Sequence, residues 1–146
     1  MIDGVIFDKD GTLFDFRKSW GAWVASLLRE IARDGDHART LGVAIGFDPD
    51  SGAFEENSVV IAGTPEDIAL PLLPHLPGES LIGLVARMNQ LSAGAEMVPA
   101  VILAEVLGAL RARGLKLGVA TNDGEAPARA HVARAGVADL FDYVVG

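Results

Sequence analysis

The feature that most constrains the fold is a short apolar run that leads directly into two acidic residues. Residues 5–7 are Val-Ile-Phe, which is typical of a buried strand, and Asp8 and Asp10 follow it. Because side chains alternate faces along a strand, residues two apart point the same way. If the strand continues for one more residue, both carboxylates lie beyond its carboxyl end, where Gly11 lets the backbone turn. The sequence therefore predicts a strand that ends in an acidic site.

Two carboxylates at one place repel each other. At about 4 Å and an effective dielectric constant near 20, the repulsion is roughly 4 kcal/mol, which is enough to require a metal ion or a retained proton. An isolated Asp-x-Asp is also compatible with a solvated loop. Whether these acids form a metal site or a solvated loop therefore depends on the other residues that lie near them.

A second junction of strand and loop lies near residue 120. Residues 115–120 predict a buried strand, Thr121 and Asn122 follow it, and helices are predicted over residues 99–113 and 125–135. This order is half of a parallel α/β unit, and residues 142–145 begin a third strand. Thr121 is expected near Asp8, because the carboxyl ends of adjacent parallel strands form the ligand crevice. Taken alone, Thr121 is a helix-capping residue. The helix predicted over residues 99–113 is expected to bury a set of apolar side chains: Val101, Ile102, Val106, Leu107 and Leu110.

The middle of the chain predicts a run of helices over residues 16–33, 37–46, 65–73 and 79–91. Thr64 and Pro65 mark a helix start. Residues 47–58 predict a turn and match a calcium loop poorly. Arg17 and Lys18 suit either a substrate anion or a solvated helix start, and the three histidines are read as structural or exposed. The first helix has an apolar stripe, whose tryptophans suit a core better than substrate stacking: Trp20, Trp23, Val24, Leu27, Leu28 and Ile31.

Composition narrows the class of protein. Half of the 146 residues are apolar, which is enough for a core, and the absence of cysteine excludes disulfides and thiolate metal sites. The net charge of −8 disfavours nucleic acid as a partner. No apolar run approaches the about 20 residues that a membrane span needs. Without a basic, apolar leader, the chain is expected in the cytoplasm.

The string Asp-x-Asp-Gly-Thr-Leu-Phe-Asp, from Asp8 to Asp15, resembles the first motif of the haloacid dehalogenase superfamily of phosphohydrolases. Residues 117–122, Leu-Gly-Val-Ala-Thr-Asn, resemble its second motif. The resemblance implies a Rossmann-like parallel α/β sheet formed by residues 1–15 and 96–146, with residues 16–95 as an inserted helical cap. Within the superfamily, the pattern is most similar to phosphoglycolate phosphatases.

The resemblance also implies roles for particular residues. Asp8 is the nucleophile and Asp10 the general acid and base, and Mg²⁺ is held by Asp8 and by the backbone carbonyl of Asp10. The phosphate of a small phosphorylated metabolite is held by Thr121, by Asn122 and by the loop at Gly11 and Thr12. The acid at position 10 points to phosphate esters, because the dehalogenase branch lacks one there.

Two parts of the family pattern are missing: a lysine after the second motif, and an acidic motif after later strands. Arg129 and Arg134 lie too early for the lysine, and Asp139 and Asp142 precede the third strand. Without later strands, residues 5–7 form an apolar sheet edge, which is prone to pairing. We therefore expect either a fragment of a longer phosphatase or a second chain that covers this edge, and poor turnover by the isolated chain. The alternative class is a non-catalytic binding or regulatory module that keeps the fold.

Overall fold

The computed structural model describes residues 2–146, which form two compact units. The first unit combines two stretches of the chain, Met1–Ser19 and Ala93–Gly146, and the second is Trp20–Ser92. The chain thus leaves the first unit after Ser19 and returns to it at Ala93.

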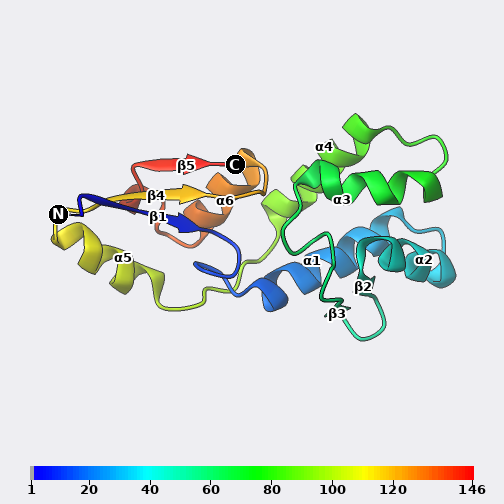
Figure 1. The fold of residues 1–146 in the computed structure, drawn as a ribbon, viewed down its shortest axis with the longest axis horizontal. Helices are drawn as coiled ribbons and strands as arrows, with labels where there is room; N and C mark the ends of the chain where they lie inside the picture. Colours follow the sequence, from blue (N-terminus) through cyan, green and yellow to red (C-terminus); the bar gives the residue numbers. More distant parts are fainter. Residues whose placement is uncertain (1) are drawn as a thin grey trace. The chain divides into compact units, whose positions relative to one another are not determined.

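The first unit is built on a three-stranded parallel sheet (Figure 1). Its strands are β1 (Gly4–Asp8), β4 (Lys116–Ala120) and β5 (Tyr143–Val145), in the order β1-β4-β5. Asp8 pairs in register with Ala120, and Ala120 pairs with Val145, so the carboxyl ends of the strands are level. The helices of this unit are α5 (Leu103–Ala112), α6 (Glu125–Arg134) and the short η2 (Ala138–Leu140). The predicted α/β class with a parallel sheet is confirmed.

The core of the first unit lies between β4 and the two helices. Leu117 and Val119 of β4 are buried together with Leu107 of α5 and Val132 of α6. In contrast, β1 lies at the edge of the sheet and alternates between exposed and half-buried residues, with Ile6 76% exposed. The expectation of an apolar edge at residues 5–7 therefore agrees with the sheet order.

The helix predicted from residue 99 begins later than expected. Helix α5 starts at Leu103, and three residues expected inside are exposed: Val101, Ile102 and Val106. The cause is a short antiparallel pairing between residues 98–100 and the loop after β1. The Asp15 amide donates to Val98 O at 2.8 Å, and the Ala100 amide donates to Leu13 O at 2.9 Å. Residues used in this pairing cannot also begin a helix, and the pairing holds the loop after β1 in place.

The second unit is mainly helical. It contains α2 (Gly35–Ile45), α3 (Pro65–Leu72), the short η1 (Leu73–His75) and most of α1 (Phe16–Ile31) and α4 (Leu81–Gly94), whose first and last residues, respectively, belong to the first unit. The predicted stripe of α1 is buried, both tryptophans included. Thr64 and Asp67 form a capping box at the start of α3, which confirms the predicted helix start. The turn predicted at residues 47–58 contains a small hairpin of β2 (Phe47–Asp48) and β3 (Ala53–Phe54).

Candidate active site

The loop after β1 turns sharply at the end of the strand. The amides of Leu13 and Phe14 both donate to Lys9 O, at 3.0 and 3.1 Å, and the Gly11 amide donates to Phe14 O at 2.8 Å. Gly11 has φ +87°, a conformation that L side chains rarely adopt. The strand geometry therefore ends at Asp8, and the backbone of residues 9–14 folds back on itself.

The two acids of the first motif have different surroundings. Asp8 is exposed, and the hydrogen bonds and ion pairs among residues 2–146 do not involve its carboxylate. Asp10 is only 15% exposed, and both of its oxygens are engaged: Lys9 Nζ lies 2.8 Å from Oδ1, and Thr121 Oγ1 lies 3.3 Å from Oδ2. Asp8 is thus available to a ligand, while Asp10 is held by the protein.

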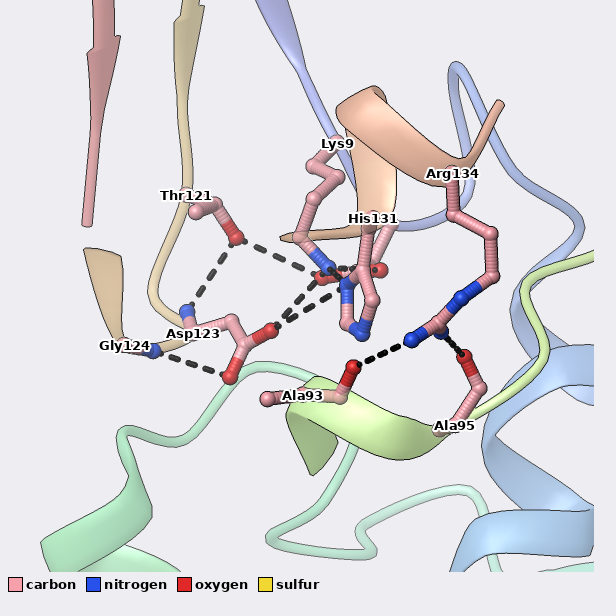
Figure 2. A network of polar contacts seen from close by, with 9 residues as sticks. Lys9, Ala93, Ala95, Thr121, Asp123, Gly124, His131 and Arg134 are labelled. Atoms are coloured by element: carbon pink, nitrogen blue, oxygen red, sulfur yellow. Dashed lines mark hydrogen bonds and ion pairs between the residues drawn. The ribbon is translucent and has the colours of Figure 1, made fainter. Parts of the chain in front are cut away.

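Lys9 is the cation beside Asp10, and its side chain is fully buried. Its Nζ also lies 3.1 Å from Asp123 Oδ2 and 3.1 Å from His131 Nδ1 (Figure 2). An ammonium group has three donors and no acceptor, so it can only donate to its neighbours. Its contacts with Asp10 and His131 are hydrogen bonds, whereas that with Asp123 Oδ2 is an ion pair without hydrogen-bond geometry. His131 Nδ1 must then accept, which makes the ring neutral with its proton on Nε2.

Thr121 joins the two loops directly. It follows β4, and its hydroxyl donates to Asp10 and accepts from the Asp123 amide at 3.1 Å. The structure therefore brings Thr121 to the acid at position 10, as the strand pattern predicts. In this arrangement the single hydroxyl proton of Thr121 is used by Asp10 and not by a ligand.

The other predicted phosphate-binding residues lie on the same two loops. Gly11, Thr12 and Asn122 are all exposed. The Gly11 amide is already used in the turn, so Gly11 contributes its conformation. Arg129 and Arg134 lie on α6 and bind elsewhere: Arg129 donates to Val144 O, and Arg134 donates to the carbonyls of Ala93 and Ala95.

Sequence reasoning missed Lys9, Asp123 and His131. The interpretation of His131 as structural or exposed agrees with its burial, but the acidic neighbour, Asp123 Oδ2 at 3.8 Å from its Nδ1, was not expected. A signal existed: the ring falls on the same helical face as Ala128 and Val132, which are buried apolar positions of α6. A lysine within the acid motif itself was a further sign, since Lys9 stands directly between the two acids.

The donor set suits Mg²⁺. This ion takes hard oxygen ligands and keeps several waters, so one or two carboxylates suffice. The exposed Asp8 carboxylate and the Asp10 backbone carbonyl are such donors. Within residues 2–146, no group of three or more His, Cys, Asp or Glu side chains is arranged to hold a metal ion. Lys9 also reduces the repulsion between Asp8 and Asp10, although its single charge is shared between Asp10 and Asp123.

The fold and this site define a class of protein. The chain belongs to the haloacid dehalogenase-like hydrolases, whose family model matches residues 2–146. The chain is 50% identical over 54 residues to a phosphoglycolate phosphatase of Rhodospirillum rubrum, a stretch that covers 37% of this chain and 22% of that protein.

Solved structures have the same fold. A predicted phosphoglycolate phosphatase from Haemophilus somnus has a TM-score of 0.58 at 17% identity, covering 99% of this chain and 62% of its own. An L-2-haloacid dehalogenase from Xanthobacter autotrophicus has a TM-score of 0.51 at 25% identity, covering 100% of this chain and 57% of its own. The chain thus spans about three fifths of the length of these structures. No helix in the described part of the chain is long and apolar enough to cross a membrane.

Proposed function

We propose that the protein acts as a Mg²⁺-dependent phosphatase on a small phosphate monoester, with phosphoglycolate as the first candidate. The observation that carries this proposal is the contact of Thr121 with Asp10 at the strand ends, beside an exposed Asp8 carboxylate. The local identity to a phosphoglycolate phosphatase supports the choice of ester. The inserted unit, Trp20–Ser92, is proposed as the cap that selects the substrate.

The proposed reaction has two steps. First, a carboxylate oxygen of Asp8 bonds to phosphorus while the bond from phosphorus to the ester oxygen breaks. Asp10 enters this step carrying a proton from solvent on the oxygen that Thr121 has released, and it gives that proton to the departing alkoxide. Second, Asp10 takes a proton from a water molecule, whose oxygen bonds to phosphorus and releases Asp8. Inorganic phosphate and the free alcohol are the products.

The remaining residues hold the phosphate. Thr12 and Asn122 are exposed on the two loops and can donate to phosphate oxygens. Thr121 reaches the phosphate once its hydroxyl turns away from Asp10. Asp8 and the Asp10 carbonyl would hold Mg²⁺, which would supply the positive charge needed to offset the repulsion between the phosphate and an attacking carboxylate.

Hydrolysis of p-nitrophenyl phosphate tests this proposal. The full chain is expected to show slow turnover that requires Mg²⁺ and disappears with EDTA. Asp8→Asn removes the nucleophile and should lower the rate by about 10³-fold or more. Asp139→Asn, an exposed acid of η2, is the matched control and should retain the rate.

A second candidate is a non-catalytic binding module, which the pairing of Asp10 Oδ1 with the buried Lys9 ammonium favours. It predicts equal background rates for the unchanged chain and Asp8→Asn. Equal rates would overturn the phosphatase proposal. Calorimetric titration with Mg²⁺ and inorganic phosphate would then show whether the site still binds them.

A further inference from the structure

The strongest unexplained feature of the first unit is the buried polar cluster of Lys9, Asp123 and His131 beside Asp10. Lys9 and His131 have side chains that are 0% exposed, and that of Asp123 is 6% exposed. Burying a charge is costly unless it is paired and hydrogen-bonded. The fold therefore keeps this cluster at a cost that an apolar core avoids.

The contacts form a closed ring across the two loops. Lys9 Nζ contacts Asp10 Oδ1, and Thr121 Oγ1 donates to Asp10 Oδ2. The Asp123 amide donates to Thr121 Oγ1, and Asp123 Oδ2 returns to Lys9 Nζ. Figure 2 shows Asp123 between Thr121 on one side and Lys9 with His131 on the other. The loop after β1 and the loop after β4 are thus joined at two places.

Asp123 is itself fixed. The Gly124 amide donates to Asp123 Oδ1 at 2.8 Å, which leaves Oδ2 for Lys9. His131 approaches from α6, one turn and more along the helix that follows the loop. The ammonium group is therefore held by an ion pair with Asp123 of the second loop and by a hydrogen bond to His131 of the following helix, and it donates to Asp10 at 2.8 Å.

We propose that Lys9 is a positioning residue for Asp10, and that Asp123 and His131 hold Lys9 in place for this purpose. Direct contact of Lys9 with substrate is disfavoured, because the side chain is fully buried and its ammonium already faces two carboxylates and an imidazole nitrogen. With one oxygen on Lys9 and the other on Thr121, the Asp10 carboxylate has a single orientation. This inference rests on the proposed function, in which Asp10 transfers protons.

Kinetics test the positioning role. Lys9→Met keeps an unbranched side chain, shorter by one atom, and removes its charge, so Asp10 loses one of its two anchors. We expect kcat to fall by at least about tenfold with KM nearly unchanged, because misplacement of a reacting group slows chemistry more than binding. Lys116→Met is the matched control, since Lys116 is 76% exposed at the start of β4. Unchanged kcat in a folded Lys9→Met chain would overturn the proposal.

Coupling between residues gives a second kinetic test. If Asp123 acts through Lys9, the kcat of Lys9→Met/Asp123→Asn equals that of Lys9→Met alone, instead of falling by the product of the single effects. Should Lys9→Met fail to fold, as judged by circular dichroism, this double variant replaces it, because it removes a buried carboxylate together with the ammonium. Independent, multiplying effects would contradict a shared path through Lys9.

A spectroscopic test needs no activity. ¹⁵N NMR of the unchanged chain near pH 7 should show His131 as a neutral ring with its proton on Nε2 and Nδ1 accepting, and the Nδ1 signal should shift in Lys9→Met. A proton on Nδ1 would overturn the arrangement. If the ring appears as predicted while Asp8→Asn and the unchanged chain hydrolyse equally, the proposed function fails and the contact between Lys9 and His131 stands.

Discussion

Gly46 shows at the scale of one residue how closely the second unit is packed. Gly46 ends α2 with φ +71°, and a Cβ added there would lie 2.8 Å from Ser58 Cα. Ser58 cannot yield easily, because it is buried and its hydroxyl donates to Ile45 O at 2.7 Å. A side chain at position 46 therefore meets both an unfavourable backbone conformation and a steric clash.

We predict that Gly46→Ala lowers the free energy of unfolding by about 3 kcal/mol, the sum of roughly 1 kcal/mol for the left-handed conformation and about 2 for overpacking. Gly52→Ala is the matched control: its φ is +72°, and nothing lies within 4 Å of the added Cβ. Gly52→Ala should lower the free energy of unfolding only by the roughly 1 kcal/mol that the left-handed conformation costs. Urea unfolding followed by the fluorescence of Trp20 and Trp23, both in this unit, measures each value; equal losses would contradict the clash.

The residue scale is also where sequence reasoning failed. The placement of Asp8, Asp10 and Thr121 at the strand ends was predictable, because strand periodicity marks these positions. Lys9 and His131 were not, since the contact between them joins residues 122 positions apart and depends on how α6 packs. A polar residue in a buried helical stripe indicates that it has a hydrogen-bond partner, but the sequence does not show which residue that partner is.

At the scale of elements, Asp142 ties the end of α5, the start of β4 and the approach to β5 together. Its carboxylate accepts from the Leu117 amide at 2.9 Å and pairs with Arg111 at 2.7 Å and Lys116 at 3.4 Å. The Leu117 amide first, and then the two cations, hold the pKa of Asp142 below its ordinary value. The folded chain therefore favours the ionised form of this carboxyl.

The sign of the pH dependence follows from that lowered pKa. Such a group stabilises the fold fully above its unfolded pKa of about 3.9, and this contribution is lost as the pH falls through the folded pKa. Asp142→Asn should thus lower the urea midpoint at pH 7, and the gap should narrow as the pH drops below about 4. Asp139→Asn is the control and should show no gap at pH 7. A gap for Asp142→Asn that stays constant with pH would show that its charge is not responsible.

Most elements were predictable because their signals are local. The stripe of α1 and the capping box of α3 are contained in a few neighbouring residues. The start of α5 was not, because the residues before it pair with the loop after β1, some 85 positions earlier. The apolar periodicity of the sequence continues into residues 99–102 and so predicts a longer helix. The pairing with the loop after β1 keeps these residues out of α5.

At the scale of the whole molecule, the exposed edge of the sheet is the main consequence of the strand order. Strand β1 is paired only with β4 among the described residues, so the hydrogen-bonding groups of its other side are open to another strand. Ile2 and Ile6 are 75% and 76% exposed at this edge. Edge strands with apolar side chains favour association, and natural proteins often place lysine there.

We therefore predict that the chain associates at high concentration and that Ile6→Lys weakens this association. The substitution places a charge at the edge strand while leaving the buried side chains of β4 untouched. Ile82→Lys is the matched control, because Ile82 is 83% exposed on α4 and belongs to no strand. Sedimentation velocity across a hundredfold range of concentration should show a larger loss of association for Ile6→Lys than for Ile82→Lys. If the two variants behave alike, the edge of β1 is not the surface through which the chain associates.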